Sequence, residues 1–384
     1  MIVLLYHFRK YLLQRQWKHF YLAAIFTGLG IVTKATLLFT IFLLPLLYFL
    51  YYVDHRHKSL LKRLFLAKVL LYILVVLAVI NLMYYFYGSF VPLSQYSFTS
   101  STFKNLQRHV AMVGFLPVPL PAPFLQSLDM LQLQAETGAG TEHSTYNGVY
   151  LLGELKMKGS FWYYYVVLLF YKLPLGTLFL CVASMPLFIM KFRWKWFIEK
   201  YMFLLLPAIF FACILSFFNQ FQTGLRHILL VFPLVFIGLG RLLQHLQAGR
   251  PLFKIITGLS IVYTFISVAI FYPYIIPYTN EFIKDKKTVY TKILDSSIDY
   301  NQVHLTPTTI GNMYPGYRVP SPAPDTGKFA ISMNQLFDKE NWNNSPYNWY
   351  RKLQPKGLDK YVILLYDVTA EDLLKAGLGR NGQK

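Results

Sequence analysis

Four cationic residues lie within or beside apolar stretches of the sequence, where lipid makes a charge costly. Lys34 follows a short apolar segment, Lys172 interrupts a long one, and Arg226 and His227 open a third. Ionisable residues at such positions usually have a functional reason. Arginine presents a planar fork to phosphate oxygens and lysine a compact charge, so these residues are candidates for binding a phosphate. Snorkelling of unrelated side chains at separate helix ends accounts for the pattern equally well.

Glu154 is the acidic residue nearest to the start of the apolar run that contains Lys172. Its carboxylate can pair with a cation, orient an acceptor hydroxyl, or remain a solvated loop charge, and spacing does not choose among these roles. The sequence contains no HExxH, Walker loop, GxSxG or cysteine–histidine cluster. The common chemistries of soluble enzymes therefore have no support.

The composition is that of an integral membrane protein. Of the 384 residues, 55% are hydrophobic and only 14% are charged, whereas about a quarter are charged in soluble domains. The net charge of +20 lies largely in short loops between apolar runs, so it does not indicate a nucleic-acid partner. Six acidic residues precede Thr279 and the other eleven lie between Glu281 and Asp372. A membrane part is thus followed by a more polar tail.

Seven apolar segments predict a bundle of about seven transmembrane helices. Most approach the roughly 20 residues needed to cross a hydrocarbon core of about 30 Å. The first is shorter, and we expect it to form a tight hairpin with the second that turns near Lys34. The segments are Phe20–Thr33, Ala35–Val53, Leu64–Phe86, Phe161–Met190, Tyr201–Phe218, Ile228–Leu246 and Ile255–Tyr272.

Basic residues orient these segments. They are concentrated before the first segment, after the second, and in the stretches Lys191–Lys200 and Gln244–Lys254. By the positive-inside rule these regions are cytoplasmic. The connection Tyr87–Ser160, the loop Asn219–His227 and the tail from Pro273 then face outside. This multi-pass topology puts the four cations towards the outer leaflet.

The predicted fold is mainly α: a polytopic helical bundle with an outer-face loop domain and a small α/β C-terminal module. Residues 1–19 are expected to form a cytoplasmic basic segment and residues 20–86 three transmembrane helices. Residues 87–160 form the outer loop, residues 161–272 four more transmembrane helices, and residues 273–384 the C-terminal module.

Local patterns add detail to the two outer regions. Phe124–Gln134 is amphipathic, which fits either a helix on the membrane surface or a helix packed within a folded loop domain. Lys328–Ser332 and Tyr361–Tyr366 read as strands, and Thr306–Pro324 reads as a proline-rich connection.

The first six residues, Met1–Tyr6, have the sequence MIVLLY and are followed by Arg9 and Lys10. This pattern is typical of the cytoplasmic end of an apolar helix, so we expect the chain to begin partway through a larger protein. A short interfacial anchor is the alternative.

A series of short motifs runs along the chain between residues 20 and 367. They are Gly28–Lys34 (GLGIVTK), Leu116–Pro123 (LPVPLPAP), Tyr150–Glu154 (YLLGE), Gly159–Tyr165 (GSFWYYY), Tyr171–Pro174 (YKLP), Gly224–His227 (GLRH), Tyr272–Glu281 (YPYIIPYTNE) and Asp295–Gln302 (DSSIDYNQ). In this order, the motifs together resemble the C-terminal two-thirds of a GT-C glycosyltransferase of the dolichyl-phosphate-mannose–protein mannosyltransferase type (glycosyltransferase family 39 and its bacterial relatives).

The resemblance implies transfer of a sugar from a polyprenyl-phosphate carrier to an acceptor hydroxyl of a protein, lipid or glycan on the outer face. It implies a mannosyltransferase-like enzyme in which Lys34, Lys172, Arg226 and His227 bind the donor phosphate and Glu154 is an acceptor-side or catalytic group. Members of the family often use a divalent cation, although no ligand set is visible in this sequence.

This chain departs from the family's pattern in two ways. Ser297, Tyr300 and Asn301 replace the family's Asn, Trp and Gly. The family's catalytic acid lies in an outer loop after its first span, whereas no acidic residue here precedes Asp54. An inactive remnant or binding module is therefore one alternative. A transporter or flippase of lipid-linked intermediates is another, and it would need ionisable residues near mid-membrane or repeated halves, which the sequence lacks.

Overall fold

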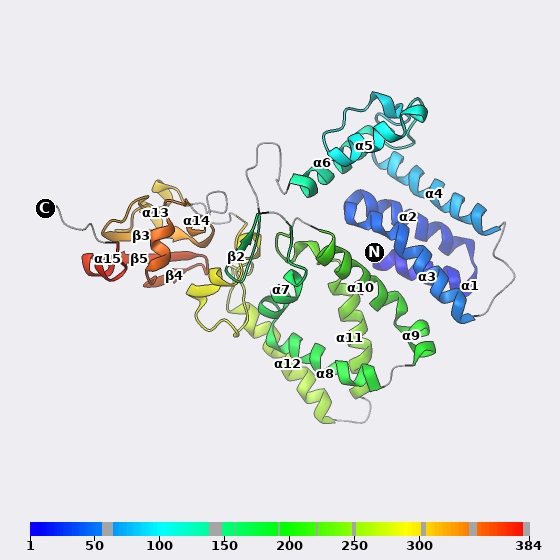
Figure 1. Cartoon of the computed structure of the whole chain (residues 1–384). Helices are drawn as coiled ribbons and strands as arrows, with labels where there is room; N and C mark the ends of the chain where they lie inside the picture. The colour runs from blue at the N-terminus through cyan, green and yellow to red at the C-terminus, as the bar shows by residue number, and fades with distance from the viewer. Residues whose placement is uncertain are drawn as a thin grey trace. The chain divides into compact units, whose positions relative to one another are not determined.

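The structure, a computed structural model, is mainly helical, as the sequence predicted (Figure 1). It describes residues 1–55, 64–137, 148–157, 159–190, 193–219, 222–247, 251–300, 305–337 and 344–378. The predicted basic loop at residues 56–63, together with Asn301 and Gln302, lies outside this set. The chain divides into two compact units, one made of Met1–Ala139, Pro186–Leu215 and Ile228–His245, the other of Gly140–Met185, Ser216–His227 and Leu246–Lys384.

The first unit begins with four α-helices and one short 3-10 helix. Helix α2 packs against both α1 and α4, and these helices are drawn in blue in Figure 1. Lys34 ends α2 with an extended backbone (φ −153°, ψ 113°), so α2 stops where the sequence predicted the turn of the hairpin. The elements are α1 (Ile2–Gln14), α2 (Trp17–Thr33), η1 (Ala35–Phe39), α3 (Thr40–His55) and α4 (Leu64–Met83).

Gly28 allows α2 and α4 to pack closely. A Cβ atom at Gly28 would lie 2.8 Å from Cβ and Cγ1 of Val79 and 3.1 Å from the carbonyl oxygen of Val76. Small residues at helix contacts in membranes permit this kind of backbone approach.

We expect Gly28→Ala to destabilise the chain by about 1–3 kcal/mol, because a branched side chain and a backbone atom would have to move. Gly240→Ala, in α11 (Phe232–Gln247), is the matched control, since a Cβ there meets no atom within 4 Å. Alanine should be neutral or stabilise that helix by up to about 1 kcal/mol. Thermal unfolding in detergent measures both changes, and an equal effect of the two substitutions would contradict the close approach.

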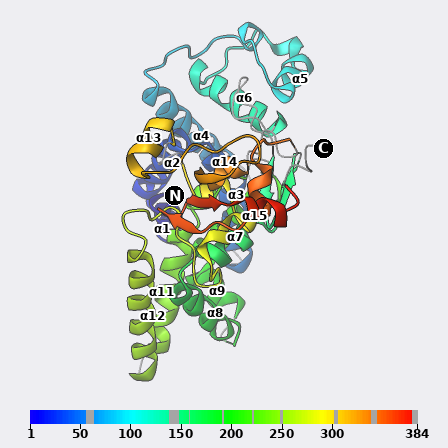
Figure 2. The same cartoon turned by 90° about the vertical axis from the view of Figure 1, so that its left-hand side faces the viewer.

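The loop after α4 folds around two helices, shown in cyan in Figure 2. Leu125 of α6 packs with Tyr96 and Phe98, so this amphipathic segment buries part of its apolar face against the loop itself. That contact favours the packed helix over the membrane-surface helix. The elements are η2 (Leu93–Gln95), α5 (Ser101–His109), η3 (Ala111–Val113) and α6 (Ala122–Thr137).

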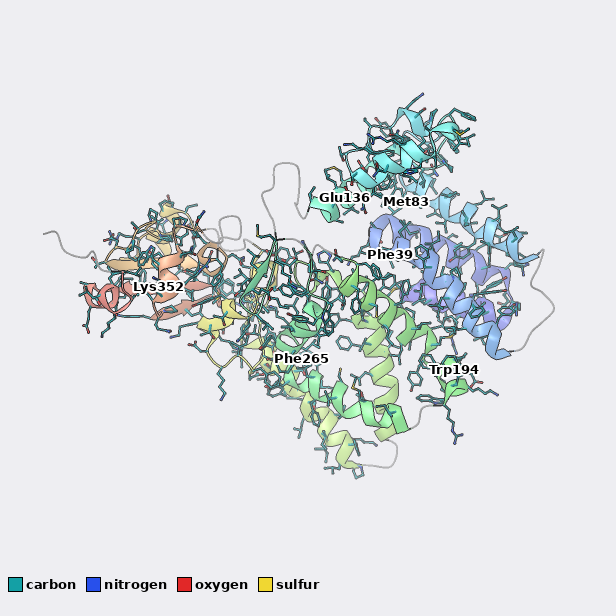
Figure 3. The ribbon with its side chains drawn as sticks, in the orientation of Figure 1. Phe39, Met83, Glu136, Trp194, Phe265 and Lys352 are labelled. Atoms are coloured by element: carbon teal, nitrogen blue, oxygen red, sulfur yellow. The ribbon has the colours of Figure 1, made fainter. Side chains whose placement is uncertain are left out.

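Two carboxylates of α6 hold the start of α5. Asp129 accepts hydrogen bonds from the backbone and hydroxyl groups of Thr99 and Ser100. Glu136, labelled in Figure 3, accepts four from Ser101 and Thr102 at 2.5–2.9 Å. Burial raises the pKa of Glu136, but the four hydrogen bonds from Thr102 and Ser101 together outweigh it and lower the pKa to about 2.

Because this pKa lies below the ordinary value of 4.5, the bonds to Glu136 stabilise the loop above pH 4.5, and this stabilisation is lost as the pH falls towards 2. We expect Glu136→Gln to release the start of α5 at neutral pH, so that trypsin cleaves faster after Lys104 and Arg108. Glu371→Gln, at an exposed i,i+4 pair with Lys375, is the control. An unchanged cleavage rate in Glu136→Gln would contradict the role of this carboxylate.

Three described helices are long and apolar enough to cross a membrane: Ala35–Tyr52, Leu66–Met83 and Pro251–Ala269. Two further pairs qualify only if each bent pair forms one span, Tyr164–Lys172 with Leu175–Met185 and Trp194–Lys200 with Met202–Phe217. The described part of the chain thus offers three to five spans, and the predicted number of seven stays a prediction. Phe265 on the third of these helices is 74% exposed (Figure 3), as a lipid-facing side chain would be.

The predicted span Phe161–Met190 is not one straight helix. It forms α7 (Tyr164–Lys172) and α8 (Leu175–Met190), and the helix axis bends by 119° between them. Pro174 explains the break, because proline excludes the helical conformation at the preceding residue, and Leu173 is extended (ψ 135°). Three other predicted segments form α2, α10 (Met202–Phe217) and α11, of 17, 16 and 16 residues. The remaining helices here are α9 (Trp194–Lys200) and α12 (Pro251–Ala269).

The C-terminal part of the second unit contains a three-stranded antiparallel sheet in the order β3-β5-β4, drawn in orange and red in Figures 1 and 2. Strands β3 (Gly327–Ser332) and β5 (Ile363–Val368) lie where the sequence predicted strands. The predicted connection Thr306–Pro324 is not wholly irregular, because the capping box of Thr306 and Thr309 begins helix α13 (Pro307–Met313). The other elements are η5 (Lys286–Thr291), η6 (Asp295–Ser297), α14 (Met333–Leu336), η7 (Asn348–Lys352), β4 (Gly357–Asp359) and α15 (Ala370–Lys375).

Candidate functional site

The second unit contains four of the five residues that the sequence nominated: Glu154, Lys172, Arg226 and His227. Lys34 belongs to the first unit, where it is half-buried at the end of α2. The surroundings of the four residues differ.

Residues 222–227, which we call the Arg226 turn, are anchored to the segment that leads into α7. The buried amide of Gln222 accepts from the backbone N–H of Phe161 and donates to its carbonyl oxygen, each at 3.0 Å. The backbone N–H of Gly224 donates to the hydroxyl of Tyr164 at 2.9 Å. These three bonds fix the turn before the short helix η4 (Leu225–His227) begins.

Gly224 brings a third segment to the turn. Its φ of +76° is in the left-handed region, and a Cβ there would lie 3.2 Å from the hydroxyl oxygen of Ser296. That hydroxyl is buried and makes no hydrogen bond to any described residue. Buried hydroxyls are normally paired, so Ser296 offers a donor and acceptor next to the turn.

The polar side chains of the turn form one hydrogen-bonded group. Arg226 Nη2 donates to Thr223 Oγ1 at 2.9 Å, and Thr223 Oγ1 lies 3.0 Å from His227 Nε2. Arg226 Nε also donates to His227 Nε2 at 3.4 Å. Because Nε2 accepts from Arg226, the pattern assigns the imidazole proton to Nδ1, and the hydroxyl of Thr223 donates to Nε2.

Arg226 carries the charge of this group at the surface. Its side chain is exposed, and its guanidinium carbon lies 5.3 Å from the ring centre of Tyr300, within the range of a cation–π contact. A guanidinium held on one side by a hydroxyl and an aromatic ring can present N–H groups to phosphate oxygens in a fixed orientation. The chemistry that this arrangement supports is recognition of an anion.

Lys172 has a different role. Its Nζ donates to the carbonyl oxygens of Ile276 and Tyr278, at 2.6 and 2.9 Å. Asn280 adds to this connection, since its side-chain amide donates to the carbonyl oxygens of Phe170 and Leu173. Two of the three ammonium donors are thus used to fix residues 276–280 to the end of α7.

Glu154 lies at a hairpin turn and is exposed. Strands β1 (Val149–Leu151) and β2 (Glu154–Lys156) pair antiparallel, with Leu151 opposite Glu154. The turn residues Leu152 and Gly153 have φ of 52° and 89°, and the backbone N–H of Leu152 donates to the carbonyl oxygen of Lys292. Among the described side chains, no hydrogen bond or ion pair joins Glu154 to Lys172, Arg226 or His227.

Three side chains at the site were not nominated from the sequence: Gln222, Thr223 and Ser296. Thr223 lies beside the glycine of the GLRH motif, and Ser296 lies in the DSSIDYNQ motif, so the motifs marked the neighbourhood without marking the residues. No sequence pattern marked Gln222 as a site residue, because an isolated glutamine in a loop can have many structural roles. The described residues contain no group of three or more His, Cys, Asp or Glu side chains able to hold a metal ion.

Removing the amide of Gln222 is expected to loosen the Arg226 turn. In Gln222→Met the backbone N–H and carbonyl of Phe161 lose their partners, which we expect to cost about 1–3 kcal/mol of unfolding free energy. Gln126→Met, at an exposed position of α6, is the control. Thermal unfolding in detergent measures the difference. Equal unfolding midpoints for the two variants would show that the hydrogen bonds between Gln222 and Phe161 do not hold the turn.

Comparison of the chain with protein-family models, with curated proteins and with solved structures gives no match.

Proposed function

We propose that this chain binds a polyprenyl-phosphate-linked sugar and transfers the sugar to an acceptor hydroxyl on the outer or lumenal face of a membrane. The observation that carries the proposal is the meeting of three motifs at the Arg226 turn. They are Gly159–Tyr165, Gly224–His227 and the part of Asp295–Gln302 up to Tyr300. The three motifs are far apart in the sequence, and the family resemblance included all of them.

In the proposed reaction, the acceptor oxygen forms a bond to the anomeric carbon of the sugar. The bond between that carbon and the phosphate oxygen breaks, its electron pair stays on the phosphate, and the hydroxyl proton passes to a base. Arg226 stabilises the charge that grows on the leaving phosphate, because its donors are already oriented by Thr223 and Tyr300.

The reaction also needs a base for the proton of the acceptor hydroxyl. Glu154 is the acidic candidate that the sequence nominated, and a place at an exposed hairpin turn leaves its carboxylate accessible to an acceptor. We assign Lys172 a positioning role, since its ammonium is engaged by two carbonyl oxygens. The proposal assigns no metal ligand.

A second candidate function is binding of a lipid phosphate without transfer. It is favoured by one observation, namely that no hydrogen bond or ion pair among the described residues joins the Glu154 carboxylate to Arg226 or His227. A binding module needs the cation and the membrane helices but no base, so it predicts binding of the donor with no turnover.

Membranes containing the chain and radiolabelled polyprenyl-phosphate mannose separate the two candidates. The transfer proposal predicts that label moves to an acceptor fraction as polyprenyl phosphate is released. It also predicts that Glu154→Gln slows this step by roughly 10²–10⁴ if Glu154 is the base, whereas Glu371→Gln has no effect. If the chain binds the donor but releases no polyprenyl phosphate, the transfer proposal is wrong and the second candidate, binding without transfer, takes its place. If the chain neither binds the donor nor releases polyprenyl phosphate, both candidate functions are wrong.

A further inference from the structure

The first unit contains an apolar pocket of about 410 Å³, a size within the range of roughly 300–1,000 Å³ found for ligand pockets. Its walls come from α1, α2, α3, α4 and α6. Several lining residues are open to the outside of the unit, with Ile41, Val69 and Ile73 exposed by 59%, 37% and 42%. A chain-like ligand can therefore enter from the side.

The middle of the pocket is apolar because its hydroxyls are paired with protein groups. Thr27 Oγ1 lies 2.6 Å from the hydroxyl oxygen of Tyr72 and donates to the carbonyl oxygen of Ala23. Neither hydroxyl needs a partner from a ligand. Around them lie aliphatic and aromatic side chains such as Ile31, Val76 and Phe124.

One end of the pocket is cationic. Arg15 follows α1, and its Nη1 donates to the hydroxyl of Tyr52 at 2.7 Å. Lys68, in the first turns of α4, places its Nζ 6.0 Å from the ring centre of Tyr11 and 5.6 Å from that of Trp17. Both cations line the pocket, and no carboxylate among the described side chains forms an ion pair with either. The positive-inside prediction puts this end at the cytoplasmic face.

The length of the pocket matches one leaflet of a bilayer. On α4 the lining runs from Lys68 to Ile80, which is about 18 Å at 1.5 Å per residue. Half of a hydrocarbon core of roughly 30 Å is about 15 Å. A ligand whose acyl chain fills the apolar part would thus place its phosphate near Arg15 and Lys68.

From this arrangement we infer that the first unit binds an anionic glycerophospholipid, with one acyl chain in the pocket and its phosphate at Arg15 and Lys68. The two cations select the anionic headgroup, and anionic lipids are those that enrich cytoplasmic leaflets. The site uses no residue of the Arg226 turn, so it is independent of the proposed transfer.

Native mass spectrometry tests the inference on the full chain, released from micelles that contain phosphatidylglycerol and phosphatidylcholine with identical acyl chains at equal concentration. The wild-type protein should retain phosphatidylglycerol in preference to phosphatidylcholine. Arg15→Gln and Lys68→Gln should each reduce this preference roughly fivefold, and the double variant about thirtyfold. Lys10→Gln is the matched control, because Lys10 lies over the ring of Tyr6 and does not line the pocket.

The acyl chain is tested separately by Ile73→Trp, which fills the pocket from its exposed side and should lower retention of both lipids. Equal retention of the two lipids by the wild-type protein would overturn the inference, as would an unchanged preference in the double variant. If Ile73→Trp retains both lipids as the wild-type protein does, the acyl chain does not lie in this pocket. Preferential retention of added polyprenyl phosphate over phosphatidylglycerol, abolished by the double variant, would also overturn the inference and assign the pocket to the prenyl carrier.

Discussion

Replacing Arg226 by glutamine should reduce sugar transfer from polyprenyl-phosphate mannose by roughly 10²–10³, the usual effect of removing one oriented donor from a developing oxyanion. The loss should appear mainly in kcat, because Arg226 is proposed to act on charge that grows during the reaction. Glutamine keeps an N–H donor, but its side chain is shorter and lacks the positive charge and the planar fork.

The variant Arg226→Lys separates the contribution of the positive charge from that of the planar guanidinium. Lysine keeps the positive charge but loses the fork that contacts Thr223 and lies over Tyr300, so we expect it to recover only part of the activity. Arg318→Gln is the matched control, because the guanidinium carbon of Arg318 lies 5.2 Å from the ring centre of Phe329 in the same type of contact. If the folded Arg226→Gln variant transfers sugar as fast as the wild-type protein, Arg226 has no role in the reaction.

Replacing Lys172 by methionine should destabilise the chain by about 1–3 kcal/mol, because the carbonyl oxygens of Ile276 and Tyr278 lose a charged donor. Methionine preserves the apolar stem, so the change isolates the ammonium. Lys284→Met, at an exposed position in the following segment, is the control. Thermal unfolding in detergent gives the stability, and donor binding is measured on the same samples.

Asn280 provides a second test of the same role. Asn280→Ala removes the bonds to Phe170 and Leu173, which tie the same segment to α7. If Lys172 acts by positioning, the effects of the two substitutions on stability should be non-additive, since both act on one connection. Unchanged stability with weaker donor binding in Lys172→Met would instead return Lys172 to the phosphate site that the charge pattern predicted.

The sequence predicted the class of the fold well, because hydropathy over long windows and alternation in strands are local signals. The end of α2 at Lys34 and the strands at 327–332 and 363–368 follow from such signals. The break at Pro174 was readable from the proline alone, yet the length of the surrounding apolar run favoured one continuous helix. Continuous hydropathy thus concealed a bend of 119°.

The candidate site was predictable only in part. A cation within an apolar run indicates that the charge has a partner, but it does not identify the partner. For Lys172 that partner is a pair of carbonyl oxygens more than a hundred residues away in sequence. For Arg226 the arrangement depends on the two hydrogen bonds of Gln222 to the backbone of Phe161 and on the left-handed backbone of Gly224. Such contacts are set by tertiary packing, which no local pattern contains.

The most direct test of the central claim is the affinity of polyprenyl phosphate for the purified chain, measured by titration calorimetry in detergent. The account predicts that Arg226→Gln weakens binding roughly tenfold or more, since a charged hydrogen bond contributes about 1.5–3 kcal/mol. The double variant Arg15→Gln/Lys68→Gln serves as the control for the lipid pocket of the first unit and should bind as the wild-type protein does. Equal affinity of the wild-type protein and Arg226→Gln would contradict the claim that this turn holds the departing phosphate.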